Sequence, residues 1–136
     1  GGILLLGTTA AVTGCTFENC SAKVSGGGVF CIGASPTVQR CNFIGCTADK
    51  GGGGAGCQSS SATFDGCMFE KCQTRHIHGG GLHIVESSPS VTECRFLRCS
   101  AGRLGGGIYA DEGSTPRIVK TTFTNCVPGN SNLPLG

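Results

Sequence analysis

Cysteine is the most frequent residue in this chain that could do chemistry, because eleven thiols occur among 136 residues. Thiols at matching positions of a repeat could form disulfides between neighbouring repeats, ligate a metal, or pack as small apolar side chains. They fall into three columns: Cys15, Cys41, Cys67 and Cys94; Cys20, Cys46, Cys72, Cys99 and Cys126; and Cys31 and Cys57. No Cys-x-x-Cys pair occurs, and four ligands from one column could not close a tetrahedron around zinc, so we expect no metal at these thiols.

Two interpretations of the cysteines remain after metal binding is set aside. Either neighbouring repeats are joined by disulfides, or the thiols stack in reduced form as buried small residues. Bridges are most compatible with the Cys20 to Cys126 column, because corner positions relax the strict alignment of strands. The odd number of cysteines leaves at least one thiol without an internal partner. Bridges would imply an oxidising compartment.

Carboxylates and histidines provide the other candidate chemistry. Glu86, Asp111 and Glu112 follow the same predicted strand in adjacent repeats, so their side chains could lie within several Å of one another. Such groups could bind calcium or perform acid–base work on a sugar, but they are more often a solvated rim, and we treat them as weak metal candidates. Three histidines within residues 76–83 precede or follow a glycine corner, where histidine is usually solvated.

The elements that must position these side chains belong to a repeat of 26 or 27 residues. Five phenylalanines mark its period, at Phe17, Phe43, Phe69, Phe96 and Phe123. Glycine triplets keep step with them at 26–28, 52–54, 79–81 and 105–107. This period with strand-like patterning predicts an all-β, right-handed parallel β-helix of about four to five coils. A β-sandwich would not explain the same triplet and phenylalanine in each unit.

Alternation within one repeat predicts three short strands and assigns their faces. The strand after each triplet points small or apolar residues inward, as at Val29 and Cys31. Its intervening positions point outward and form a possible contact face, because exposed apolar and aromatic side chains favour sugar stacking or protein docking. That outward column consists of Leu4, Phe30, Gly56, His83 and Tyr109.

Residues 1–126 are expected to form the solenoid and residues 127–136 a loop or linker. The first residues align with the middle of a repeat, so we expect a segment of a longer solenoid or a unit that meets another chain end to end. The net charge is +2 and only 13% of residues are charged, which predicts no basic stripe and no nucleic-acid partner. No apolar run is long enough to span a membrane.

The residues from Ser35 to Ala48, followed by the glycine run at 51–54, resemble the repeats of pectin-lyase-like β-helix proteins. They look most like the repeats of polymorphic outer-membrane-protein adhesins. This resemblance implies surface adhesion or a structural role, whereas the wider fold also includes lyases and epimerases. The chain departs from that pattern at the second cysteine column, where the family carries a turn asparagine. The catalytic residues of the enzymes cannot be mapped onto this chain.

These observations predict a non-enzymatic structural or adhesive module, extracellular or at the cell surface, with no cofactor. Its expected partners are other protein chains or cell-surface glycans, with end-to-end self-association as a further possibility that would make a filament. The alternative is a carbohydrate-active enzyme of the polysaccharide lyase or epimerase type. Fold by itself does not choose between these classes.

Overall fold

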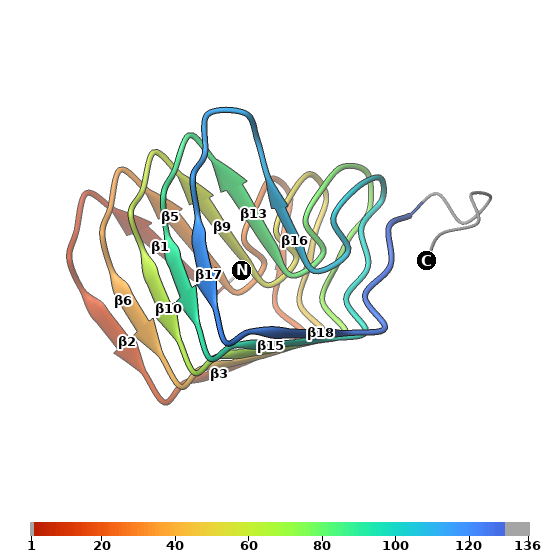
Figure 1. Cartoon of the computed structure of the whole chain (residues 1–136), viewed down its shortest axis with the longest axis horizontal. Helices are drawn as coiled ribbons and strands as arrows, with labels where there is room; N and C mark the ends of the chain where they lie inside the picture. Colours follow the sequence, from red (N-terminus) through yellow and green to blue (C-terminus); the bar gives the residue numbers. More distant parts are fainter. Residues whose placement is uncertain (1, 130–136) are drawn as a thin grey trace.

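The computed structural model describes residues 2–129, which wind into coils stacked side by side (Figure 1). Parallel pairing between successive coils builds four sheets. Sheet A contains β1 (Ile3–Leu6), β5 (Val29–Ile32), β9 (Ala55–Gln58), β13 (Leu82–Val85) and β16 (Ile108–Ala110). Sheet B contains β2 (Ala11–Thr13), β6 (Thr37–Gln39), β10 (Thr63–Asp65), β14 (Ser90–Thr92) and β17 (Arg117–Val119).

Sheet C contains β3 (Thr16–Glu18), β7 (Asn42–Ile44), β11 (Met68–Glu70), β15 (Arg95–Leu97) and β18 (Thr122–Thr124). Sheet D contains β4 (Ser21–Ala22), β8 (Thr47–Ala48) and β12 (Gln73–Thr74). The all-β parallel solenoid is therefore confirmed, but the prediction of three strands per coil missed sheet D. Two-residue strands are too short to show alternation in a sequence. Across residues 2–129 no helix has the length and hydropathy that crossing a bilayer requires.

The phenylalanine column forms one continuous stack inside the solenoid. Ring centroids are 5.0 Å apart between Phe17 and Phe43, and 4.6 Å apart between Phe43 and Phe69. The stack continues at 4.5 Å to Phe96 and 5.0 Å to Phe123, with each pair of rings nearly parallel. Because paired strands lie about 4.8 Å apart, in-register pairing puts each ring directly against its copy. The predicted single file of phenylalanines is confirmed.

Each glycine of a triplet is required for a different physical reason, as the triplet at residues 26–28 illustrates. Gly26 has a φ of 66°, a left-handed conformation that favours glycine. A Cβ on Gly27 would collide with the backbone carbonyls of Gly53 and Thr47. A Cβ on Gly28 would lie 2.6 Å from the Phe43 ring, so that the ring packs directly on the backbone. The triplet and the phenylalanine of the same coil are thus two halves of one packing contact.

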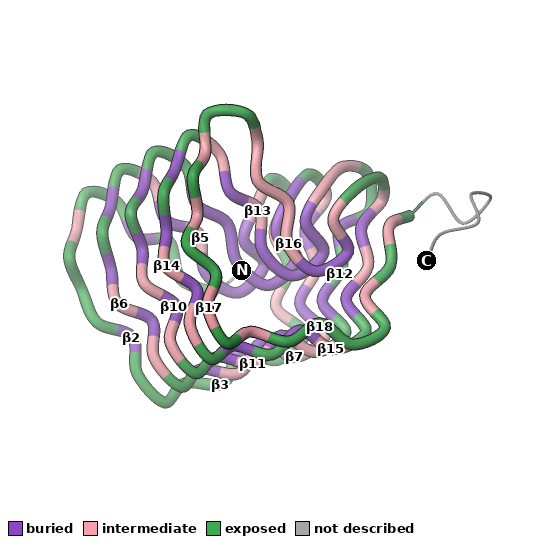
Figure 2. The backbone as a smooth tube through the Cα atoms, in the orientation of Figure 1, coloured by how far each residue is buried: buried purple, intermediate pink, exposed green. Residues whose placement is uncertain are grey.

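Burial follows the predicted alternation in the inner coils. The middle residues of β6, β10 and β14 are Val38, Phe64 and Val91, and all three are fully buried. Figure 2 shows buried stretches that recur in the successive inner coils, whereas β17 and β18 in the last described coil are mostly exposed. Ile118 is 43% exposed and Phe123 is 47% exposed, because no further coil in residues 2–129 packs over them.

The stack predicts a gradient of stability along the solenoid. Phe69→Ala should lower the free energy of unfolding by about 3–5 kcal/mol, because it removes a fully buried ring that has a neighbour on both faces. Phe123→Ala should cost much less, since that ring has one stacked neighbour and is half exposed. Urea denaturation of both variants measures this difference, and equal losses would contradict the packing described here.

Candidate functional site

The two long cysteine columns serve as corner hydrogen-bond donors. In the second column, Cys46 Sγ donates to the carbonyl of Phe17 at 3.1 Å, and Cys72 Sγ donates to that of Phe43 at 3.2 Å. In the first column, Cys67 Sγ lies 3.3 Å from the carbonyl oxygen of Val38 in the preceding coil. Each thiol thus adds a hydrogen bond to a carbonyl of the coil before it, because a carbonyl oxygen has two lone pairs and can accept a second bond beside that of the sheet.

Thr121 is a donor at an equivalent corner. It occupies the first column after Cys94, and its hydroxyl lies 3.0 Å from the Val119 carbonyl oxygen of its own coil and 3.3 Å from the Val91 carbonyl oxygen of the coil before. The eleven cysteines are all free thiols, so of the two interpretations the structure shows stacked reduced thiols and no disulfides between coils. The columns face the interior as expected except at Cys15, which is exposed because no coil in residues 2–129 lies before it.

The environment of the thiols controls their protonation. Burial raises the pKa of Cys41, and a hydrogen bond with Cys31 together with burial raises the pKa of Cys57. A thiol held protonated is a poor nucleophile and a poor metal ligand. In the second column, the hydrogen bond between Cys46 and Cys72 lowers the pKa of the first thiol and raises that of the second.

The donor role can be tested with an isosteric pair at Cys94, whose thiol lies 3.4 Å from the carbonyl oxygen of Phe64. Cys94→Thr should keep the bond and change stability little, as Thr121 does one coil later. Cys94→Val has the same shape as the threonine variant without the hydroxyl, and should cost about 0.5–1.5 kcal/mol more because it loses this hydrogen bond. Urea denaturation compares the two variants, and equal stabilities would show that only packing matters at this corner.

The acidic residues are brought together only in part, and one of them has a structural role. Asp111 accepts hydrogen bonds at Oδ1 from the Ser114 hydroxyl at 2.7 Å and from the Glu86 backbone amide at 3.2 Å. The bond from Ser114 lowers the pKa of Asp111. The Glu86 and Glu112 side chains are exposed. Within the described part of the chain, no three His, Cys, Asp or Glu side chains are placed to hold a metal ion.

The predicted contact face lies on sheet A, where Phe30, Gly56, His83 and Tyr109 are paired in register across four strands. Leu4 is 56% exposed at one end of this column, whereas Phe30, His83 and Tyr109 are half-buried. The ring centroids of His83 and Tyr109 are 5.6 Å apart. His78, from the loop before β13, joins them by stacking on Tyr109 at 4.1 Å. The column therefore ends in a cluster of three rings.

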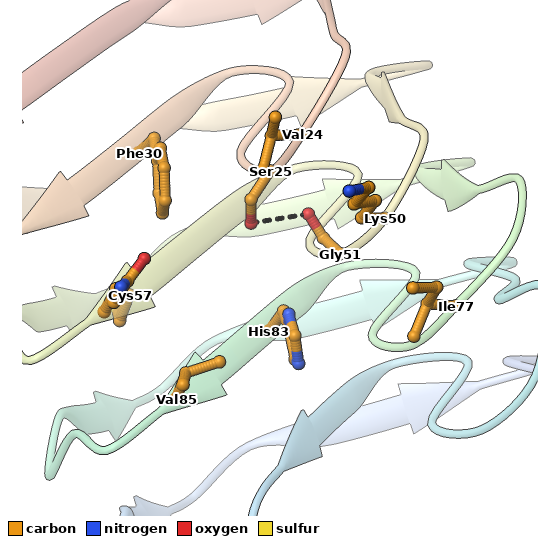
Figure 3. Close-up of a pocket in the computed structure, with 10 residues that line it drawn as sticks. Val24, Ser25, Phe30, Lys50, Gly51, Cys57, Ile77, His83 and Val85 are labelled. Carbon is orange, nitrogen blue, oxygen red and sulfur yellow. Dashed lines mark hydrogen bonds between the residues drawn. The ribbon is translucent and has the colours of Figure 1, made fainter.

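Gly56 interrupts this column and creates a notch between Phe30 and His83. A Cβ on Gly56 would collide with the hydroxyl of Ser25, which donates to the Gly51 carbonyl at 2.7 Å. The notch has a volume of about 250 Å³ and is mainly apolar. It is lined by Val24, Ser25, Phe30, Lys50, Gly51, Cys57, Gln58, Ile77, His83 and Val85 (Figure 3).

Comparison with known proteins agrees with this architecture. A family model described as a right handed beta helix region matches residues 1–131. The chain belongs to the right-handed β-helix family. Comparisons with curated proteins and with solved structures gave no significant match. The family therefore establishes the fold of this β-helix, and its function has to be argued from the side chains that the coils present.

Several residues of the notch were missed by reasoning from the sequence. Val24, Lys50 and Ile77 belong to the loops between sheets D and A, where no alternation assigns a side chain to a face. In this β-helix the loops stack on one another, because the Lys50 amide donates to the Val24 carbonyl at 3.0 Å. Alignment of the residues immediately before each glycine triplet could have shown that they form a column of their own.

A second ladder was also missed, at the corner after sheet A. The Ser60 amide donates to the Ser87 hydroxyl at 2.9 Å, and the Ser87 amide donates to the Ser114 hydroxyl at 3.1 Å. The spacing of 27 residues between successive serines was the available signal. These serines connect coils through side chain to backbone bonds, as the cysteines do at the other corners.

Because of the ring cluster, we expect the free energy of unfolding of this β-helix to fall as the pH is lowered. Burial and the neighbouring His78 lower the pKa of His83, with a weaker opposing effect from Asp111. The unfolded state therefore binds a proton first as the pH falls below about 6.5, and stability decreases until the lowered folded-state pKa is reached. His83→Gln should reduce this loss of stability between about pH 7 and pH 5 in urea denaturation.

His76→Gln is the matched control, because His76 is exposed and outside the ring cluster. It should retain the acid-dependent loss that His83→Gln reduces. An unchanged pH dependence in His83→Gln would contradict the burial of that imidazole.

Proposed function

We propose that this β-helix is a non-enzymatic structural or adhesive module of an extracellular or cell-surface protein, and that sheet A is its contact face. The observation that carries the proposal is the gathering of Phe30, His83 and Tyr109 on one outward column of a rigid sheet. Aromatic side chains that remain partly exposed offer a large contact area at low cost in conformational entropy. The expected partners are other protein chains or cell-surface glycans.

The rigidity of the scaffold supports this role. The side chains of the face project from strands that pair on both sides in the inner coils, as β5, β9 and β13 do. Beneath them, Val29, Leu82 and Ile84 are fully buried. A face held in this way needs little ordering when a partner binds, which favours affinity.

The competing proposal is a carbohydrate-active enzyme, which would use Glu86, Asp111 and Glu112. The Asp111 carboxylate already accepts hydrogen bonds from Ser114 and from the Glu86 amide, so it serves as a cap for the local backbone. Acid–base work on a sugar needs a side chain that is free to exchange a proton with the substrate. The bonds at Asp111 favour the structural role for this cluster.

The proposed function predicts which substitutions abolish adhesion. Beads coated with this protein should bind to cultured-cell surfaces or to immobilised extracellular-matrix proteins. The double change Phe30→Ala and Tyr109→Ala should reduce bead retention at least about fivefold, because it removes the aromatic anchors of the face. Met68→Ala is the matched control, since it truncates a half-buried outward side chain on sheet C.

Two outcomes would count against this function. Retention that is equally strong in the double variant would exclude sheet A as the contact face. Turnover of an acidic polysaccharide by the unaltered protein, abolished by combining Glu86→Ala, Asp111→Ala and Glu112→Ala, would favour the lyase or epimerase alternative.

A further inference from the structure

The loops between sheets D and A form a continuous ridge beside the contact face. The Lys50 amide donates to the Val24 carbonyl at 3.0 Å, and the His78 amide donates to the Lys50 carbonyl at 3.1 Å. The Arg103 amide then donates to the Ile77 carbonyl at 2.7 Å. Equivalent loop residues of successive coils therefore follow one another at about the strand spacing of 4.8 Å.

This ridge concentrates positive charge. Lys23, Lys50, Arg75 and Arg103 all lie on it with exposed side chains, and Asp49 is the acidic residue among them. The chain has ten basic and eight acidic residues. Four basic residues and one acidic residue lie on the ridge, which leaves six basic and seven acidic residues elsewhere. The overall charge of the chain does not reveal this ridge, because the coils bring together cations that are distant in sequence.

Asp49 offsets one of the four positive charges of the ridge. Its carboxylate lies 3.8 Å from Arg75 Nε, and both side chains are largely in water, 40% and 64% exposed respectively. The attraction that holds an exposed ion pair of this kind together is weak and is screened by salt, so that Arg75 can exchange Asp49 for another carboxylate. The cations of the ridge are therefore available to an anionic partner.

The apolar notch opens directly onto this ridge. Val24, Lys50 and Ile77 line the notch and also belong to the ridge loops. Figure 3 shows Phe30 and His83 on either side of the strand that carries Cys57, with Lys50 and Ile77 on the neighbouring loops. A volume of about 250 Å³ is below the usual range for drug-sized ligands and fits one bulky side chain.

The lining of the notch favours a protein side chain over a sugar. The polar side chains of the lining are Lys50, Gln58 and His83, and the Ser25 hydroxyl already donates to the Gly51 carbonyl at 2.7 Å. The rest of the surface is mainly apolar, with Val24, Phe30, Ile77 and Val85 as its side chains. Sugar hydroxyls would lose their hydrogen bonds to water in such a site, whereas an aromatic or branched apolar side chain would not.

We propose that the ridge and notch bind an extended acidic segment of a partner protein, with one apolar side chain in the notch and its carboxylates opposite Lys50, Arg75 and Arg103. This inference rests on the proposed contact function of sheet A and names the chemistry of the partner. Charge complementarity along the ridge would orient the segment, and the buried side chain would supply most of the affinity.

The test uses fluorescence anisotropy with a labelled heptapeptide in which a central phenylalanine is flanked by pairs of glutamates. This peptide should bind about tenfold more tightly than its alanine counterpart, because the apolar anchor fills the notch. Raising the salt from about 20 to 200 mM should weaken binding, since the carboxylate contacts are exposed. A version with lysines in place of glutamates should not bind.

Reversing single charges on the protein tests whether the heptapeptide binds at the ridge. Lys50→Glu should weaken binding of the heptapeptide about tenfold, because it removes a cation from the rim of the notch and adds a repelling charge. Lys71→Glu is the matched control, since it makes the same charge change at an exposed position outside the ridge. Phe30→Ala should also weaken binding, through the loss of one wall of the notch.

Three results would overturn the inference. The first is equal binding of the phenylalanine and alanine peptides, and the second is equal weakening by Lys50→Glu and Lys71→Glu. The third is tight binding of a sulfated polysaccharide or single-stranded DNA at the ridge without binding of the acidic peptide. Bead adhesion that depends on Tyr109 but not on Lys50 would refute this inference alone and leave the proposed function standing.

Discussion

The structure depends on one constraint, which is that parallel in-register pairing places each residue directly over its equivalent in the next coil. A residue type can occupy the inside of such a stack only if it packs well against its own copy at about 4.8 Å. Phenylalanine does so by stacking its ring, with centroids 4.5 Å apart between Phe69 and Phe96. The glycine triplet follows from the same constraint, because the ring of each coil occupies the space that a Cβ on the third glycine would need.

Because of the same constraint, polar side chains of the interior form the same kind of hydrogen bond in successive coils. A buried side chain with a hydrogen to donate can satisfy the backbone of the neighbouring coil, and the stack then repeats the bond. Cys46 and Cys72 do this with thiols. Ser87 does the reverse, because its hydroxyl oxygen accepts a hydrogen bond from the Ser60 amide. Residues that could do chemistry elsewhere thereby become structural here, as Asp111 does where it caps the backbone of Glu86.

Inward positions stay apolar even where the residue changes, as from Val38 to Phe64 to Val91, whereas outward positions also change in polarity, and it is there that function can arise. The outward column of sheet A changes from Phe30 to Gly56 to His83, and this irregularity produces a notch on the face. The loops vary in a similar way while their backbones stay hydrogen-bonded. A repetitive interior and a variable exterior are therefore compatible, since the first requires only apolar side chains that pack between coils.

The sequence by itself determined the coil, its period, the stack from Phe17 to Phe123 and the outward column that contains Phe30 and Tyr109, because these follow from strict repetition and alternation. Only the tertiary structure decided the rest. Free thiols rather than bridges, and the role of Asp111, depend on which backbone group each side chain meets in the next coil. Lys50 and Arg103 come to lie on one ridge, with the notch beside them, only in the folded coils. Their loops show no alternation of apolar and polar residues that would assign side chains to a face.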